Sequence, residues 1–212
     1  MKKAVVLLSG GLDSSTVLFI AKRQGYELYA LTCNYGQRHL REIEAAKQIA
    51  NIAGVVEHRI VDFTSFTILG SALTVDIDVP DEGLSEDIPV TYVPARNTIF
   101  LSFALSWAEQ IEAEVVFCGV NAIDYSGYPD CRPEYIAAMQ EVYRLGTKCG
   151  IEDNPILLAA PLSNMTKVDI VRRALELEPN ILKLSWSCYQ GSKEPCGVCD
   201  SCRIRQDAML QV

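Results

Sequence analysis

Short apolar runs of the length of a buried strand alternate along the chain with stretches in which apolar residues recur at helical spacing. The short runs predict strands at 5–8, 27–33, 55–61 and 115–119. The periodic stretches predict helices at 13–25, 40–53, 99–111, 133–145 and 166–177. Strands that alternate with helices pair in parallel through right-handed crossovers. The pattern therefore predicts a doubly wound α/β fold with a mainly parallel sheet.

Length and composition indicate one domain with a small appendage. The chain has 212 residues, of which 49% are hydrophobic, so it is long enough to bury a sizeable core. The composition changes after Pro179, where the last cysteines gather. We therefore expect an α/β domain at 1–180 and a smaller C-terminal segment at 181–212 that packs on it.

The charge of the chain argues against a nucleic-acid binder. The formal net charge is −8, whereas nucleic-acid surfaces need clustered Lys and Arg. The acids concentrate at 74–91, a stretch without Lys or Arg, which we interpret as a solvated loop.

The apolar runs also indicate where the protein works. None reaches the ~18 residues of a membrane span. The apolar start is interrupted by Ser9, Gly10, Gly11 and Asp13, so no export signal is expected. We expect a cytoplasmic protein without a membrane partner, whose eight cysteines stay reduced.

The first predicted strand runs into the first predicted helix through a loop rich in glycine and hydroxyls. The loop and its borders are Leu8, Ser9, Gly10, Gly11, Leu12, Asp13, Ser14 and Ser15. Two glycines alone make a tight turn, but hydroxyls and bare amides at a helix N-terminus also form an anion site. Neither a Gly-Lys-Ser/Thr motif nor the Gly-x-Gly-x-x-Gly spacing is present, which excludes the Walker loop and the dinucleotide fingerprint.

This loop resembles that of the ATP pyrophosphatase superfamily, the PP-loop. The resemblance implies an adenine nucleotide alpha hydrolase-like fold, in which residues 8–15 hold the pyrophosphate of ATP. Asp13 is a candidate ligand for Mg²⁺, an ion that contacts few protein oxygens when it carries phosphates.

Two further basic residues are candidates for contact with an anion. Thr166 and Asp169 form a plausible capping pair, which places Lys167 in the first turn of a helix, where a cation opposes the helix dipole. Arg96 precedes an apolar helix. From the sequence alone, a solvated Lys167 and an anion contact are about evenly favoured, and Arg96 would be a surface residue. The superfamily resemblance favours phosphate or carboxylate contact, so we expect Asp13, Lys167 and Arg96 to be catalytic.

Four cysteines near the C-terminus have metal-ligand spacing: Cys188, Cys196, Cys199 and Cys202. Four thiolates satisfy a tetrahedral ion, and Cys-x-x-Cys turns bring two sulfurs onto one metal. A ferredoxin-type iron–sulfur pattern has its fourth cysteine downstream, whereas here it lies upstream. We favour a closed structural Zn²⁺ site. No role is assigned to the other cysteines, Cys33, Cys118, Cys131 and Cys149.

Taken together, stretches across the chain resemble the 7-cyano-7-deazaguanine synthase family, nitrile-forming ligases of queuosine biosynthesis. The stretches are LLSGGLDSS, LTCNYGQRH, YVPARNTIFLS, GVNAIDYSGYPDCRPEY, PLSNMTKVDIV and WSCYQ…PCGVCDSC. The resemblance implies a homodimer that uses ATP, ammonia and 7-carboxy-7-deazaguanine. The N–H donors of the deazaguanine suit a carboxylate, and its ring suits an aromatic side chain. The candidates are Asp124, Asp130, Glu134, Tyr35, Tyr125 and Tyr128.

Two other functions remain open from the sequence. Another PP-loop enzyme, of the tRNA thiolase or tRNA-lysidine ligase type, would need a basic surface, which an acidic chain does not favour. A non-enzymatic zinc-ribbon binding module would have no need for the Ser-Gly-Gly-Leu-Asp-Ser loop between a strand and a helix.

Overall fold

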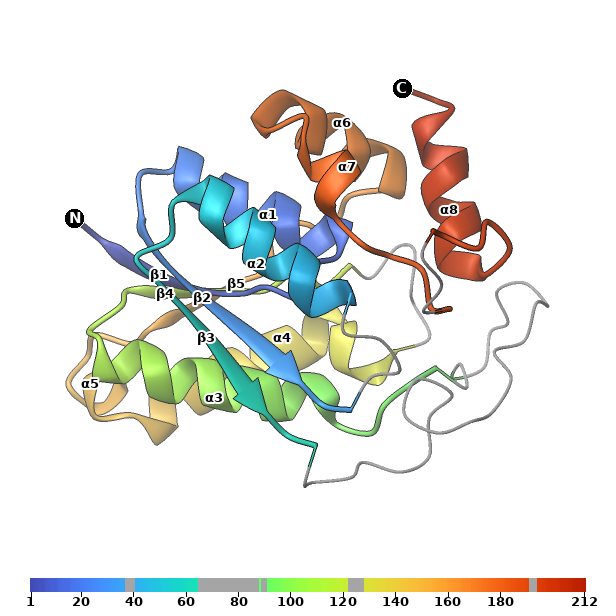
Figure 1. Cartoon of the computed structure of the whole chain (residues 1–212). Coiled ribbons are helices and arrows are strands. Elements are labelled where there is room, and N and C mark those ends of the chain that lie inside the picture. The colour runs from blue at the N-terminus through green and yellow to red at the C-terminus, as the bar shows by residue number, and fades with distance from the viewer. Residues whose placement is uncertain (37–40, 65–87, 89–90, 122–127, 191–193) are drawn as a thin grey trace.

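The protein is built on a five-stranded parallel sheet, in the order β3-β2-β1-β4-β5. The computed structural model describes residues 1–36, 41–64, 88, 91–121, 128–190 and 194–212 (Figure 1). The strands are β1 (Lys3–Leu7), β2 (Glu27–Asn34), β3 (Glu57–Asp62), β4 (Val115–Phe117) and β5 (Leu157–Ala159). The helices are α1 (Leu12–Arg23), α2 (Arg41–Ala53), α3 (Arg96–Gln110), α4 (Pro133–Gly146), α5 (Lys148–Ile151), α6 (Lys167–Leu177), α7 (Ile181–Leu184) and α8 (Asp200–Met209), with a 3₁₀ turn at Pro129–Cys131.

Helices cover both faces of the sheet, so each strand contributes to two cores. Figure 1 shows α1, α2, α6 and α7 on one face and α3 and α4 on the other. In β1, Val6 packs into the core beneath α1, whereas Val5 packs into the core beside α3. Both side chains are fully buried. Burial on both faces is why this strand reads as an uninterrupted apolar run rather than as an alternating one.

The predicted doubly wound fold is confirmed, with shifted element bounds. All four predicted strands and all five predicted helices are present. The helix predicted at 99–111 begins at Arg96, which brings this arginine into its first turn. Strand β5 and the short helices α5 and α7 were not predicted. The acidic stretch at 74–91 lies almost entirely outside the described residues.

The C-terminal segment packs on the α/β unit. Helix α8 lies against α6, and Figure 1 shows it beside the same face of the sheet as α1 and α2. Ile181 of α7 and Ala208 of α8 belong to the same buried cluster as Val6 of β1. The segment predicted as a separate element therefore shares a core with the sheet, and the division at residue 180 stays a prediction.

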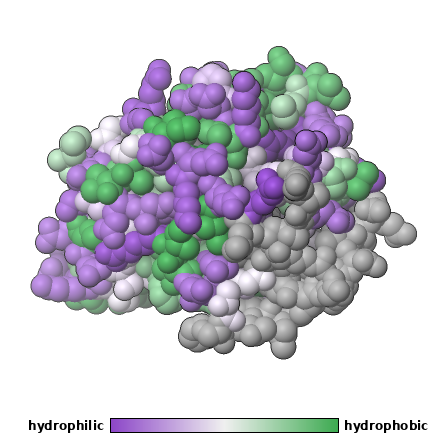
Figure 2. Space-filling view, in the orientation of Figure 1, coloured by the Kyte–Doolittle hydropathy of each residue, from purple (hydrophilic) through white to green (hydrophobic). Residues whose placement is uncertain are grey.

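The surface and the helix lengths bear on the prediction that no membrane is involved. Figure 2 shows mostly hydrophilic side chains on the described part of one face, with hydrophobic patches between them. Within the described ranges, every helix is too short or too polar to cross a bilayer.

Candidate active site and metal centre

A cavity of about 300 Å³ opens where the order of the strands reverses. From β1 the chain adds β2 and β3 on one side of this strand and then returns to add β4 and β5 on its other side. In open α/β sheets, ligands bind at the carboxyl ends of the strands at such a point. The lining residues come from the loop after β1, the segment after β4, the first turns of α2 and α3, and the C-terminal segment.

The loop after β1 needs glycine where it meets α2. Gly10 has φ +87°, in the left-handed region. A Cβ at this position would lie 2.1 Å from the carbonyl oxygen of Glu42 and 2.8 Å from the amide nitrogen of Ala46. The carbonyl of Gly10 accepts a hydrogen bond of 2.9 Å from the amide of Trp186. The loop is therefore held between α2 and the C-terminal segment.

The hydroxyls of the loop bond within the loop itself. The Oγ atoms of Ser9 and Ser14 are 2.9 Å apart, and the Ser15 hydroxyl donates to the carbonyl of Gly11 over 2.6 Å. The amide of Gly11 donates to Ser9 Oγ at 3.3 Å. Of the predicted ATP-binding residues, those that line the cavity are Leu8, Ser9, Gly11, Leu12, Asp13 and Ser14. Gly10 and Ser15 do not line the cavity, but their hydrogen bonds to Trp186 and Gly11 hold the loop in place.

Asp13 and Lys167, predicted separately as site residues, form an ion pair in the cavity. Lys167 Nζ lies 2.9 and 2.8 Å from the two carboxylate oxygens of Asp13. The side chains of Lys167 and Asp13 are only 11% and 24% exposed. Lys167 is the first residue of α6, and the predicted capping box of Thr166 and Asp169 that begins this helix is present. The cap fixes the start of α6 and thereby aims Lys167 at the loop.

Arg96 begins α3 and reaches the same cavity. The preceding residue, Ala95, has φ 54°, a left-handed conformation that turns the chain into the helix. The guanidinium of Arg96 lies 5.5 Å from the ring centroid of Tyr35, and its Nη1 donates to the Tyr35 hydroxyl at 3.4 Å. Burial raises the pKa of Tyr35 to about 12, so this hydroxyl stays protonated beside the arginine.

The three acids predicted to contact the substrate ring are placed differently from one another. Asp130 is buried and accepts a hydrogen bond of 3.0 Å from the backbone amide of Asn97, in the first turn of α3. Glu134 is exposed in the first turn of α4. Neither is among the residues that line the cavity. Asp124 lies outside the described residues, as does the predicted ring-stacking residue Tyr125.

The other two predicted tyrosines, Tyr35 and Tyr128, both line the cavity. The Tyr128 hydroxyl lies 2.6 Å from Thr91 Oγ1.

Two charged residues in the cavity were not predicted. Glu42, in the first turn of α2, lines the cavity, and burial raises the pKa of its carboxyl to about 7 while Arg96 opposes this rise. Arg205 of α8 donates to the carbonyls of Leu182 and Ser185 and to Ser187 Oγ. Burial lowers the pKa of its guanidinium. Glu42 and Arg205 lie in amphipathic helices. In such a helix the sequence pattern assigns a charged residue to the solvent-exposed face.

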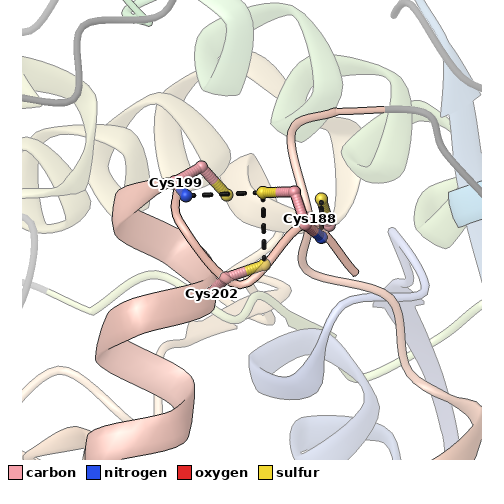
Figure 3. Close-up of side chains that lie close together, drawn as sticks. Cys188, Cys199 and Cys202 are labelled. Atoms are coloured by element: carbon pink, nitrogen blue, oxygen red, sulfur yellow. Dashed lines mark hydrogen bonds between the residues drawn. The ribbon is translucent and has the colours of Figure 1, made fainter. Parts of the chain in front are cut away.

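The four predicted cysteine ligands meet at one point. Their sulfurs all lie within 4.8 Å of one another, and those of Cys196 and Cys202 are 4.0 Å apart. Figure 3 shows Cys188, Cys199 and Cys202 close together beside the start of α8. A tetrahedron with Zn–S distances of about 2.3 Å places its sulfurs about 3.8 Å apart.

Backbone amides donate to two of these four sulfurs. Cys188 Sγ accepts from the amides of Gln190 and Cys196, both at 3.3 Å. Cys196 Sγ accepts from the amide of Cys199 at 3.4 Å. The donor set fits Zn²⁺, and four thiolates would fill its coordination, as in structural zinc sites.

Comparisons with known proteins agree on one family. The model of a family described as "Queuosine biosynthesis protein QueC" matches residues 3–212. A protein of Thermosynechococcus vestitus named 7-cyano-7-deazaguanine synthase is 58% identical, over 100% of this chain and 92% of the relative. One of Trichodesmium erythraeum with the same name is 56% identical, over 99% of this chain and 96% of the relative. Among solved structures, NMN synthetase from Francisella tularensis superposes with a TM-score of 0.53 at 17% identity, covering 97% of this chain and 76% of that one, which shows the fold alone.

Proposed function

The chain belongs to the family of queuosine biosynthesis protein QueC, and we propose that it converts 7-carboxy-7-deazaguanine, ammonia and ATP into 7-cyano-7-deazaguanine. One observation carries the proposal. The loop after β1, Lys167 and Arg96 come from distant parts of the chain and line a single cavity at the switch point of the sheet.

The reaction requires that an oxygen be made a good leaving group. A substrate carboxylate oxygen attacks the α-phosphorus of ATP, which forms an acyl adenylate and releases pyrophosphate. Ammonia then attacks the carbonyl carbon, AMP leaves and an amide remains. A second adenylation, of the amide oxygen, followed by loss of AMP and the amide protons, leaves the nitrile. Each step is helped mainly by positioning and charge stabilisation.

The residues of the cavity suit these tasks. The backbone amides at the start of α1 and the cation of Lys167 favour the charge of the departing pyrophosphate. Asp13 would hold Mg²⁺, which neutralises phosphate charge when it is bound. Arg96 presents a forked cation to the substrate carboxylate, and the Tyr35 hydroxyl and ring hold the guanidinium in place.

The zinc site has a supporting role in this proposal. Cys188 itself lines the cavity, and Trp186, two residues earlier, bonds the carbonyl of Gly10. The metal would therefore fix one wall of the nucleotide site without taking part in the chemistry. We also propose that the protein is a homodimer, which light scattering of the purified protein tests.

The decisive experiment is a product assay with the purified enzyme. We expect AMP and pyrophosphate to form from ATP only when 7-carboxy-7-deazaguanine is present, and the nitrile to form only when ammonium is added. The amide, 7-amido-7-deazaguanine, should also be converted with consumption of ATP. ATP turnover that ignores the deazaguanine, or that instead depends on tRNA, would exclude the proposed reaction.

A further inference from the structure

The cavity holds a carboxylate that has no hydrogen-bond partner among the described residues. Among the described residues that line it, the acids are Asp13 and Glu42. Asp13 is engaged by Lys167. Within the described part of the chain, no hydrogen bond or ion pair satisfies the carboxylate of Glu42, although burial raises its pKa to about 7. A half-buried carboxylate without a hydrogen-bond partner is costly unless a ligand completes its hydrogen bonds.

The position of Glu42 in a helix does not explain why this acid lines the cavity. An acid in the first turn of a helix is stabilised by the helix dipole, and Glu44, in the same turn of α2, serves that purpose while exposed to solvent. Glu42 instead faces the cavity. The backbone of its own turn is pressed against Gly10, so Glu42 is fixed beside the nucleotide loop.

The surroundings of Glu42 suit a flat, aromatic ligand. The charged or titratable groups that act on it are Arg96 and Tyr35. The Tyr35 ring packs on Phe100 with centroids 5.7 Å apart, and both residues line the cavity. Leu31, Leu101 and Val120 add apolar surface to the same cavity. An aromatic and apolar wall with one carboxylate and one guanidinium matches a heterocycle that carries N–H donors and a carboxylate of its own.

We propose that Glu42 recognises the ring edge of the substrate, by accepting hydrogen bonds from the ring N–H and the exocyclic 2-amino group of the 7-deazaguanine. This assignment rests on the proposed function, and it gives to Glu42 the task that the sequence assigned to Asp124, Asp130 or Glu134. The two adjacent N–H groups match the two oxygens of one carboxylate, as in other bidentate pairs. Arg96 would then hold the substrate carboxylate within the same cavity.

The test is direct binding, measured by calorimetry with a non-hydrolysable ATP analogue present. The ligands are 7-carboxy-7-deazaguanine and its analogue without the 2-amino group. The proteins are the wild type, Glu42→Gln and the matched control Glu44→Gln. Hydrogen bonds to a charged group typically contribute on the order of 10- to 100-fold in binding. We expect Glu42→Gln to bind the parent ligand weaker by about that factor and to lose most of the preference for the amino group.

The control and the remaining readouts separate this role from others. Glu44→Gln should bind both ligands as the wild type does, and Glu42→Gln should keep its affinity for the ATP analogue. Unchanged binding of the parent ligand by Glu42→Gln overturns the assignment. So does a rise in KM for ammonium alone, which would mean that Glu42 binds ammonium, or a fall in kcat alone, which would mean proton transfer.

The assignment remains testable even when Glu42→Gln does not fold. Equal affinities of the wild-type protein for the parent ligand and for its analogue without the amino group overturn it. A wild-type protein that forms no nitrile from 7-carboxy-7-deazaguanine, ATP and ammonium disproves the proposed function, and the assignment falls with it. Nitrile formation by the wild type together with an unaffected Glu42→Gln disproves the assignment alone.

Discussion

Replacing Gly10 by alanine is expected to destabilise the protein more than the same change at any glycine that faces open space. Gly10 has φ +87°, a conformation that costs an L-residue about 1–2 kcal/mol. Its new Cβ would lie 2.1 Å from the carbonyl oxygen of Glu42, so the loop and α2 would have to move apart. Because the obstacle is backbone, no change of side-chain rotamer relieves it.

The magnitude follows from these two contributions. Overpacking of a tight contact typically costs about 1–3 kcal/mol. Alanine also lowers the conformational entropy of the unfolded chain, which stabilises the folded state by roughly 0.4–1 kcal/mol. The net loss in the free energy of unfolding is therefore roughly 1–4.5 kcal/mol for Gly10→Ala. Gly25 has φ +84°, and a Cβ at this position would meet no atom within 4 Å, so Gly25→Ala should cost only about 1 kcal/mol.

Urea unfolding of the two variants, followed by circular dichroism, measures the difference. We expect a lower midpoint for Gly10→Ala than for Gly25→Ala, with equal slopes. We also expect a weaker affinity for ATP in Gly10→Ala alone, since only this change moves the loop. Equal midpoints would refute the reasoning, because they would mean that the contact between the loop and α2 relaxes at no cost.

Three further outcomes test other parts of the structure. Asp13→Ala should abolish nitrile formation while the thermal unfolding curve keeps its cooperative shape, and near wild-type turnover would disprove its role. Cys199→Ser should lower zinc content and thermal stability, and X-ray absorption of the wild type should show four sulfur neighbours at about 2.3 Å; a mixed sulfur and oxygen shell or an iron edge would contradict the closed site. Tyr143→Phe should lower the free energy of unfolding by about 1 kcal/mol in urea, because the buried hydroxyl donates to the carbonyl of Leu101 at 2.9 Å, and an unchanged midpoint would contradict this.

The parts of the fold that sequence predicted are those with local signals. The buried strand 5–8 and the helix with Ile43, Ala46 and Ile49 follow from runs and periodicity, which depend only on neighbouring residues. Strand β5 has three residues and includes the exposed Leu157, so it carries too little pattern to be recognised. The short helices α5 and α7, of four residues each, fail for the same reason.

In the candidate site, too, only the residues with a local sequence signal could be predicted. The four cysteines could be predicted because their spacing alone describes a metal site. Glu42 could not, because its significance comes from the loop, Arg96 and the cavity, which meet only in the folded chain. Asp130 was a candidate because of its motif, and in the folded chain its carboxylate accepts a hydrogen bond from the first turn of α3. The contact of Asp130 with the substrate stays a prediction.

The hydrogen bond between Trp186 and Gly10 has a consequence for how the protein is made. On the ribosome, the loop after β1 emerges early, whereas Trp186 and Arg205, which line the same cavity, emerge much later. A nascent chain can therefore pair β1 with β2 long before all of the residues that line the cavity have been synthesised. The cavity is complete only after the cysteine segment has folded onto the loop, so the folding of this segment becomes a late step in the biogenesis of the enzyme.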